Sequence, residues 1–127
     1  MNLNDCFNFN DFRKLAQKKL PGPIFHYIDG AADDEVTYKR NSQSFNDVDL
    51  VPNVLAGVEE VDMTTKIMGQ ELSMPFYCAP TALQRLFHHE GERAVARAAS
   101  SSGTMFGVSS LATVTVEDIA KISTGPK

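Results

Sequence analysis

Two short apolar runs separated by a single helix constrain the fold of this chain more than any other feature. The first run, Phe76–Ala79, lies between Pro75 and Pro80, and the second is Met105–Val108. A run of this length with turn residues at its borders is typical of a strand buried on both faces, and proline marks where sheet pairing stops. The intervening segment, Glu90–Ser102, reads as a helix. A strand, a helix and a strand in this order form a βαβ unit, whose two strands are parallel.

The helix of the βαβ unit has small residues on the side expected to pack against the sheet. These residues are Ala94, Val95, Ala98 and Ala99. Gly103 follows as a helix cap that can adopt left-handed backbone angles. A further helix is predicted to start at Thr115, since a threonine followed by Glu117 and Asp118 suits the positive end of a helix.

Three helices are predicted before this unit. The first begins with a cap at Asn10 or Asp11 and ends at Pro21-Gly22-Pro23, because proline cannot continue the hydrogen-bond ladder. Its apolar positions follow the 3.6-residue period: Phe12, Leu15, Ala16 and Leu20. The second helix is expected over Ile24–Ala31. The third starts at Asp33 or Asp34, with acidic residues in its first turn, and runs to about Phe45.

The segment between the third helix and the βαβ unit has two parts. Residues 47–57 read as extended and irregular, with Pro52 interrupting them. Residues 64–73 predict a hairpin that turns around Gly69-Gln70, because the branched and apolar residues on either side favour strands.

The composition describes one ordinary globular domain. The chain has 127 residues, 43% of them hydrophobic, and a formal net charge of -4. It contains no basic stripe, so nucleic acid is not an expected partner. No apolar run reaches the ~18 residues that cross a bilayer, and the polar start does not read as a signal peptide. A cytoplasmic location is expected, with peripheral association at the inner face of a membrane left open.

The cysteines and histidines show no metal-binding pattern. Cys6 and Cys78 form no Cys-x-x-Cys pair, and the three histidines lack ligand spacing, so no metal site is predicted. Cys78 is expected to be a small buried thiol rather than a nucleophile. His88 and His89 are expected to be solvated residues at the start of a helix.

Three separated blocks carry a resemblance to a known family. They are residues 27–37 (YIDGAADDEVT), residues 73–84 (SMPFYCAPTALQ) and residues 109–113 (SSLAT), with the further segment 89–93 (HEGER) between the last two. In order and spacing the blocks are similar to the amino-terminal third of the FMN-dependent α-hydroxy-acid-oxidising enzymes. That family includes L-lactate dehydrogenases, glycolate oxidases and flavocytochrome lactate dehydrogenases.

The resemblance implies an α/β fold that is the N-terminal part of a TIM (β/α)8 barrel. Residues 1–127 would be the incomplete N-terminal portion of an FMN hydroxy-acid dehydrogenase domain. A helical segment over about 10–46 would precede a barrel start over about 64–127, with a floor hairpin and the first two barrel strands. Two parallel strands alone have open edges, so the chain is expected to be part of a longer parent enzyme.

The resemblance also implies roles for particular residues. The phenol of Tyr27 would hydrogen-bond the carboxylate of the substrate, and its alignment is set by Thr37, ten residues later. An alignment shifted by one residue would select His26, which lacks the phenol that the role needs. Pro80, Thr81 and Ala82 match the loop whose backbone approaches the flavin ring, and Ser109 matches a serine that hydrogen-bonds FMN.

Other family residues lie outside this chain. The histidine that takes the substrate proton, the arginines that hold its carboxylate and the groups that bind the FMN phosphate all come later in family members. No catalytic residue is therefore expected within residues 1–127. Leu111 departs from many oxidases, in which a tryptophan stands over the substrate, and this departure favours lactate or a larger hydroxy acid over glycolate.

The function implied for the parent is FMN-dependent oxidation of an L-2-hydroxy acid, with L-lactate favoured, to the 2-oxo acid. The isolated chain is expected to be inactive. Two alternatives stay open: a non-catalytic truncated product or interaction module, and another FMN-binding TIM-barrel oxidoreductase. The parent is expected to be a homo-oligomer that meets its electron acceptor, or a membrane surface, through regions outside this chain.

Overall fold

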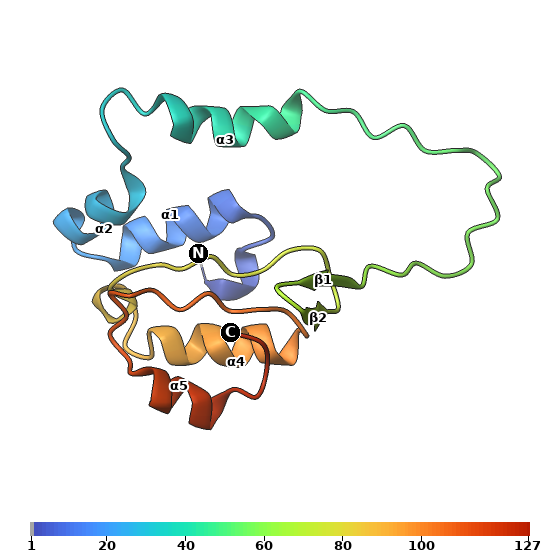
Figure 1. Ribbon diagram of the computed structural model, residues 1–127. Helices are drawn as coiled ribbons and strands as arrows, with labels where there is room; N and C mark the ends of the chain where they lie inside the picture. Colours follow the sequence, from blue (N-terminus) through green and yellow to red (C-terminus); the bar gives the residue numbers. More distant parts are fainter. Residues whose placement is uncertain (1) are drawn as a thin grey trace. The chain divides into compact units, whose positions relative to one another are not determined.

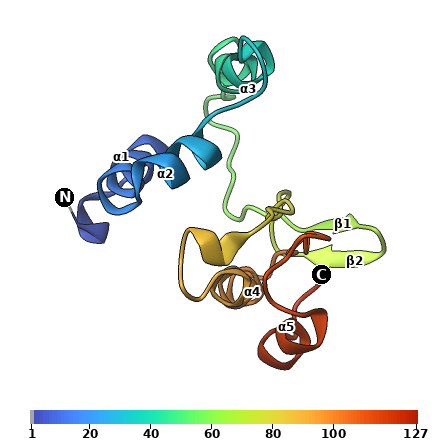
Figure 2. The same ribbon diagram turned by 90° about the vertical axis from the view of Figure 1, so that its left-hand side faces the viewer.

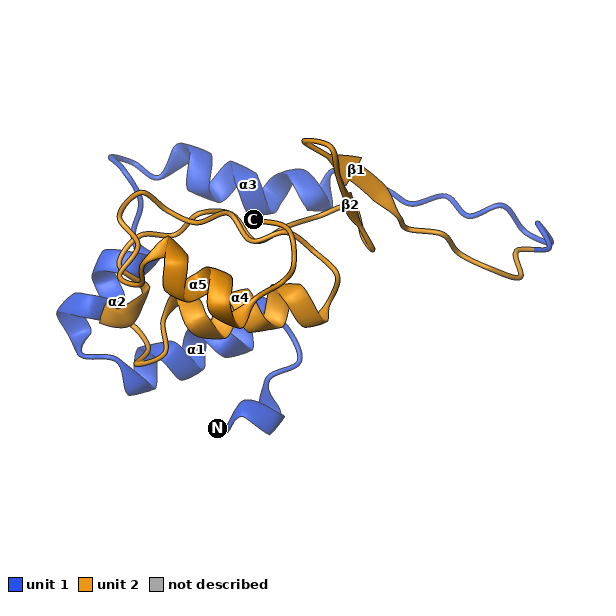
Figure 3. Ribbon diagram, turned by 60° about the horizontal axis from the view of Figure 1, so that its bottom comes forward, with its two compact units in different colours: residues 1–57 blue, residues 58–127 orange. Residues whose placement is uncertain are grey.

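The computed structural model describes residues 2–127. The chain divides into two compact units, residues 1–57 and residues 58–127, which are coloured separately in Figure 3. No helix within residues 2–127 is both long and apolar enough to cross a membrane.

The first unit is helical. It contains a short 3-10 helix, η1 (Leu3–Asp5), followed by α1 (Phe9–Lys19), α2 (Gly22–Asp29) and α3 (Val36–Asn46). The predicted cap of the first helix is wrong. Asn8 has the extended backbone of a cap, and its side chain accepts a hydrogen bond from the Asp11 amide at 3.1 Å. Asn10 and Asp11 already lie inside the first turn of the helix.

α1 and α2 are in contact, and each contributes one buried apolar side chain, Leu15 and Phe25 respectively. A paired hydrogen bond also joins them: the Arg13 guanidinium donates to both oxygens of Asp29, with 2.7 Å between Nη2 and Oδ2. α1 ends just before Pro21-Gly22-Pro23, as predicted. Leu20 is extended and its amide closes the last turn.

α3 starts two to three residues later than predicted. Asp33 and Glu35 have positive φ angles, 49° and 58°, which interrupt the right-handed helix. The acidic residues therefore precede the first turn instead of lying in it. No residue of α3 is buried within this unit, so no packing contact there stabilises a further turn at the N-terminus of the helix.

The second unit begins with the predicted hairpin. β1 (Thr65–Ile67) and β2 (Gln70–Leu72) pair antiparallel, with Thr65 opposite Leu72. The turn residues are Met68 and Gly69, whose φ angles are 49° and 78°. Two successive positive φ angles are those of a type I′ turn, which matches the twist of a two-stranded hairpin. The turn therefore lies one residue earlier than predicted.

The two predicted strands of the βαβ unit meet in a parallel bridge between Cys78 and Phe106. The Cys78 amide donates to the Met105 carbonyl at 3.0 Å, and the Gly107 amide donates to the Cys78 carbonyl at 2.9 Å. The parallel arrangement is confirmed, but neither run forms a full strand.

Burial on both faces is wrong for the first run. Phe76 is 63% exposed, whereas Phe106 in the second run is 1% exposed. Within residues 2–127, the backbone hydrogen bonds of the first run go only to residues 104–107, so the run has a sheet neighbour on one side. Cys78, expected to be buried, is half-buried.

α4 (Glu92–Ser101) and α5 (Val116–Ile122) pack against each other beside the two strand segments, as Figures 1 and 2 show. The buried core of the unit consists of Ala96, Ala99, Phe106, Val114 and Ile119. The predicted face of the helix is partly wrong. Ala98 is exposed, and the most buried positions are Glu92, Ala96 and Ala99, which are spaced four and three residues apart.

Both predicted helix signals in this unit are confirmed. Gly103 ends α4 with a φ of 64°. The Thr115 side chain caps α5 by accepting from the Asp118 amide. After α5 the chain returns beside the second run, where the Phe106 amide donates to the Pro126 carbonyl at 3.0 Å. The segments around residues 78, 106 and 126 therefore lie side by side in the same order as in the sequence. α4 connects the first segment to the second, and α5 lies between the second and the third.

Candidate functional site

The loop that follows the first run, residues 80–86, lies against the second run. Pro80 packs on Gly107 so closely that a Cβ atom at Gly107 would be 2.8 Å from Pro80 Cδ and 3.2 Å from the Cys78 carbonyl oxygen. Real Cβ atoms do not approach other atoms this closely, so glycine at position 107 permits the contact. Thr81 is exposed and Ala82 is half-buried. The short 3-10 helix η2 (Gln84–Leu86) completes the loop.

The loop that follows the second run, residues 109–113, is joined to the first loop by backbone. The Leu83 amide donates to the Leu111 carbonyl at 3.1 Å. Within the second loop, Ser109 Oγ accepts from the Leu111 amide at 3.1 Å, and the Ser109 carbonyl accepts from the Ala112 amide. The structure therefore brings together Pro80, Thr81, Ala82 and Ser109, at the ends of two neighbouring parallel segments.

The donors available on these loops suit a planar acceptor ligand. The backbone amides of Thr81 and Ala82 donate no hydrogen bond to any group within residues 2–127. An amide on an exposed loop can donate to the nitrogen and oxygen atoms of a flavin ring. The small Ala82 and the flat ring of Pro80 leave the backbone approachable.

Tyr27 belongs to α2, in the first unit. Its side chain is 63% exposed. α2 is held to α1 by the bond from Arg13, which lowers the pKa of Asp29 below its usual range. His26, which an alignment shifted by one residue would select in place of Tyr27, lies edge-on to Phe25 with ring centroids 5.6 Å apart.

His88 and His89 are both exposed, with ring centroids 4.4 Å apart. His88 Nδ1 accepts from the Glu90 amide, which places the pair at the approach to α4 as expected. Among residues 2–127 there is no group of three or more His, Cys, Asp or Glu side chains that could hold a metal ion.

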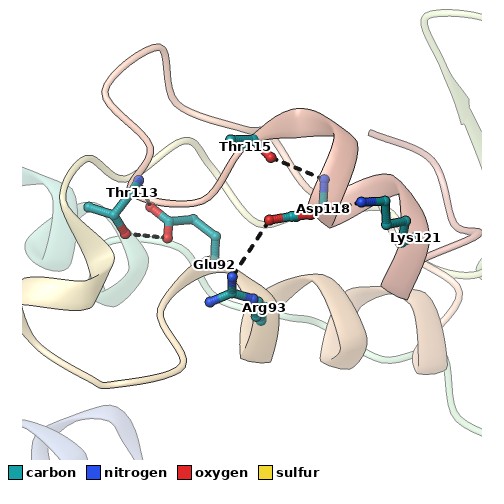
Figure 4. A network of polar contacts seen from close by, with 6 residues as sticks. All are labelled: Glu92, Arg93, Thr113, Thr115, Asp118 and Lys121. Atoms are coloured by element: carbon teal, nitrogen blue, oxygen red, sulfur yellow. Dashed lines mark hydrogen bonds and ion pairs between the residues drawn. The ribbon is translucent and has the colours of Figure 1, made fainter.

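Sequence reasoning missed a buried carboxylate beside the two loops. Glu92, at the start of α4, is fully buried, and Figure 4 shows it reaching toward Thr113. Its Oε1 accepts from the Thr113 amide at 2.8 Å and its Oε2 accepts from the Thr113 hydroxyl at 2.6 Å. Burial raises the pKa of Glu92, but hydrogen bonds from the side chain and backbone of Thr113 and from the backbone of Glu92 and Gln84 together outweigh it, so the pKa is lowered. The segment 89–93 was the only signal for this position.

Comparison with known proteins identifies the family. Residues 16–127 match the family described as FMN-dependent dehydrogenase. The chain belongs to this family. It is 44% identical over 119 residues to glycolate oxidase of Spinacia oleracea and 40% identical over 124 residues to glycolate oxidase 1 of Zea mays. These matches cover 94% and 98% of this chain but 32% and 33% of the relatives, so the chain spans about a third of their length.

Solved structures of similar proteins agree with this assignment. An (S)-mandelate dehydrogenase matches with a TM-score of 0.87 and 35% identity, over 98% of this chain and 34% of that protein. A Pediococcus acidilactici protein assigned as a lactate oxidase matches with a TM-score of 0.85 and 32% identity, over 93% of this chain and 33% of its own. The α/β class is confirmed by this likeness, while the closed barrel remains a prediction for the whole protein.

FMN is the cofactor of the family. A flavin ring presents several hydrogen-bond acceptors along one edge. The donors on the two loops fit such a group: the amides of Thr81 and Ala82, which donate to nothing else within residues 2–127, and the hydroxyl of Ser109.

Proposed function

We propose that this chain forms part of an FMN-dependent enzyme that oxidises a small L-2-hydroxy acid, L-lactate being favoured, to the 2-oxo acid. The observation that carries the proposal is the Leu83–Leu111 hydrogen bond, which joins two loops at the ends of neighbouring parallel segments in a member of this family. In barrels and other parallel sheets, ligands bind beyond these ends of the strands.

The residues of this chain would have three tasks. The backbone of Pro80, Thr81 and Ala82 lies along the flavin ring, and Ser109 hydrogen-bonds it. Tyr27 donates its phenolic proton in a hydrogen bond to the substrate carboxylate and so orients the α-carbon. FMN, when bound, accepts the two electrons that leave this carbon. The proton acceptor comes from a part of the enzyme outside this chain.

Leu111 supports the choice of substrate. It is 63% exposed on the loop that carries Ser109, where an aliphatic side chain leaves more room than an aromatic ring. Named relatives of this chain include glycolate oxidases, a mandelate dehydrogenase and a protein assigned as a lactate oxidase. More room at residue 111 favours lactate or a larger hydroxy acid over glycolate.

Steady-state kinetics of the parent enzyme with an artificial electron acceptor test this proposal. The expected order of kcat/KM is L-lactate above glycolate, and Leu111→Trp should shift the ratio of the two toward glycolate. An FMN-loaded enzyme that oxidises none of L-lactate, glycolate and (S)-mandelate would overturn the proposed function. A preference for glycolate that Leu111→Trp leaves unchanged would overturn the choice of substrate.

The same proposal covers the setting of the enzyme. We propose that residues 1–127 are the N-terminal portion of one catalytic domain, in a cytoplasmic homo-oligomer. Its electron acceptor, or the inner face of a membrane, would be contacted by regions outside this chain.

A further inference from the structure

We infer that Glu92 and Thr113 act as positioning residues that hold the two FMN loops, residues 80–86 and 109–113, in their relative places. This inference rests on the proposed function, which assigns these loops to the flavin. Neither residue is placed against the cofactor or substrate. Their role would be exerted through the loops that they join.

Thr113 connects three parts of the unit through two groups. Its amide and its hydroxyl both donate to Glu92, at the N-terminus of α4, over 2.8 and 2.6 Å. The same hydroxyl oxygen accepts from the Arg85 amide at 3.2 Å, which comes from the first loop. One side chain thus ties the second loop to the first loop and to the helix between them. A threonine hydroxyl can serve in this way because it donates one hydrogen bond and accepts others.

The burial of Glu92 makes this connection rigid. Its side chain is excluded from solvent, and both carboxylate oxygens are occupied by Thr113. Hydrogen bonds to a buried charged group are stronger than those between neutral groups. A buried carboxylate also tolerates displacement of its donors poorly, because an unpaired buried charge is costly.

Two further contacts press the first loop onto α4 and anchor the helix. A Cβ atom at Gly91 would lie 2.5 Å from Arg85 Cγ and 3.0 Å from the Arg85 amide nitrogen, so the loop backbone sits directly on the helix start. Arg93, next to Glu92, reaches instead to Asp118 at the start of α5, over 3.7 Å, as Figure 4 shows. Of these two adjacent residues, Glu92 therefore binds the second loop through Thr113, and Arg93 binds α5 through Asp118.

The Leu83–Leu111 hydrogen bond connects this network to the proposed FMN residues. Leu83 follows Ala82 directly, and Leu111 lies two residues after Ser109. A change in the separation of the loops at Arg85 and Thr113 would therefore displace the amides of residues 81 and 82 relative to Ser109. Displacements of about 1 Å are enough to weaken a preorganised site strongly.

The test compares Thr113→Val with Thr113→Ser in the parent enzyme. Valine has nearly the same shape as threonine but lacks the hydroxyl, whereas serine keeps it. We expect hydrogen–deuterium exchange in the peptide 80–87 of the cofactor-free protein to rise roughly tenfold in Thr113→Val, because a charge-assisted hydrogen bond is lost. The dissociation constant of FMN should rise by a similar factor, and Thr113→Ser should restore both values to within about twofold of the original protein.

Thr115→Val is the matched control. It also removes a threonine hydroxyl that accepts from a backbone amide, that of Asp118, but this hydroxyl caps α5 and touches neither loop. It should lower thermal stability and speed exchange in the peptide 116–122, while the peptide 80–87 and the FMN dissociation constant stay unchanged.

Unchanged exchange in the peptide 80–87 of Thr113→Val would overturn the inference, as would faster exchange without any loss of FMN affinity. An equal loss of FMN affinity in Thr115→Val would show that the loss in Thr113→Val comes from lower overall stability, and this result would also overturn the inference. None of these measurements requires turnover. An enzyme that binds FMN but oxidises no 2-hydroxy acid would therefore contradict the proposed function while leaving this inference testable.

Discussion

At the scale of single residues, the exposed Tyr27 on α2 tests the proposed substrate contact. Tyr27→Phe removes the phenolic donor and keeps the ring, so the proposed hydrogen bond to the substrate carboxylate should be lost. Such charge-assisted bonds contribute roughly 1.5 to 3 kcal/mol, so kcat/KM of the parent enzyme should fall about ten- to a hundred-fold. Steady-state kinetics on L-lactate measure this change.

Tyr38→Phe and Tyr77→Phe are the controls for that substitution, since neither position matches a family residue with a chemical role. Both should leave turnover nearly unchanged, and Tyr27→Phe should leave the FMN content of the enzyme unchanged. Loss of flavin from Tyr27→Phe, or a change in kcat/KM of less than about twofold, would contradict the assigned role.

Glu92 makes a prediction about pH. Its pKa is lowered in the folded protein, because hydrogen bonds to the carboxylate, from Thr113 and from the backbone of Glu92 and Gln84, together outweigh the effect of burial. A lowered pKa means that the folded state binds fewer protons than the unfolded state as pH falls through the acidic range. The contribution of Glu92 to stability is therefore complete above the ordinary pKa of glutamate and is lost progressively as pH falls below it.

Thermal unfolding of the parent enzyme between neutral pH and about pH 3 measures this contribution, by comparison with Glu92→Gln. At neutral pH the glutamine variant should be the less stable of the two, and the difference should shrink as the pH falls. Asp29 and Asp118 also have lowered pKa values, so both proteins lose stability in acid and only their difference reports on Glu92. A difference that grows in acid would show that the sign assigned here is wrong.

At the scale of elements, Gly91 decides how the first loop meets α4. Gly91 has φ 51° and ψ -131°, which side chains rarely adopt, and a Cβ there would collide with Arg85. Gly91→Ala should therefore destabilise the parent enzyme by more than about 1 kcal/mol and lower its FMN affinity. Denaturant unfolding and a flavin titration would measure the two effects.

Gly22→Ala provides the comparison for Gly91→Ala. Gly22 opens α2, and a Cβ there would have open space around it. The substitution should cost less than Gly91→Ala, because no atom obstructs the added Cβ, and the remaining cost comes from Pro23, which disfavours helical backbone at the preceding residue. Equal losses of stability in the two variants would indicate that the collision at Arg85 is relieved at little cost.

At the scale of the whole molecule, the 127-residue chain alone should not hold FMN. Its proposed contacts, from Pro80 to Ala82 and at Ser109, run along one side of the ring, whereas small-ligand sites bury most of the ligand surface. A titration followed by flavin fluorescence should show no saturable quenching at micromolar protein. Tight binding of one FMN per chain would mean that residues 2–127 hold a complete site, contrary to the roles proposed here.

Much of the secondary structure could be predicted from the sequence alone, because the signals are local. The bonds that cap α5 at Thr115, end α4 at Gly103 and close the hairpin at Gly69 involve residues within a few positions of one another. The steric limits of glycine and proline and the reach of a threonine hydroxyl act over the same distance. The family blocks likewise predict that loops 80–82 and 109–113 belong to the FMN site, because each block is a continuous stretch of sequence.

Only the tertiary structure decided which residues are buried and which distant segments meet. Phe76 was expected to be interior but is exposed, Ala98 faces away from the core, and the charged Glu92 is fully buried. The return of Pro126 to Phe106 had no sequence signal either. Burial depends on what lies opposite a side chain, and the partner is often far away in the chain: Thr113 is 21 residues from Glu92 and 28 residues from Arg85. Local patterns specify a helix or a turn, but the partners that bury a carboxylate are set by packing.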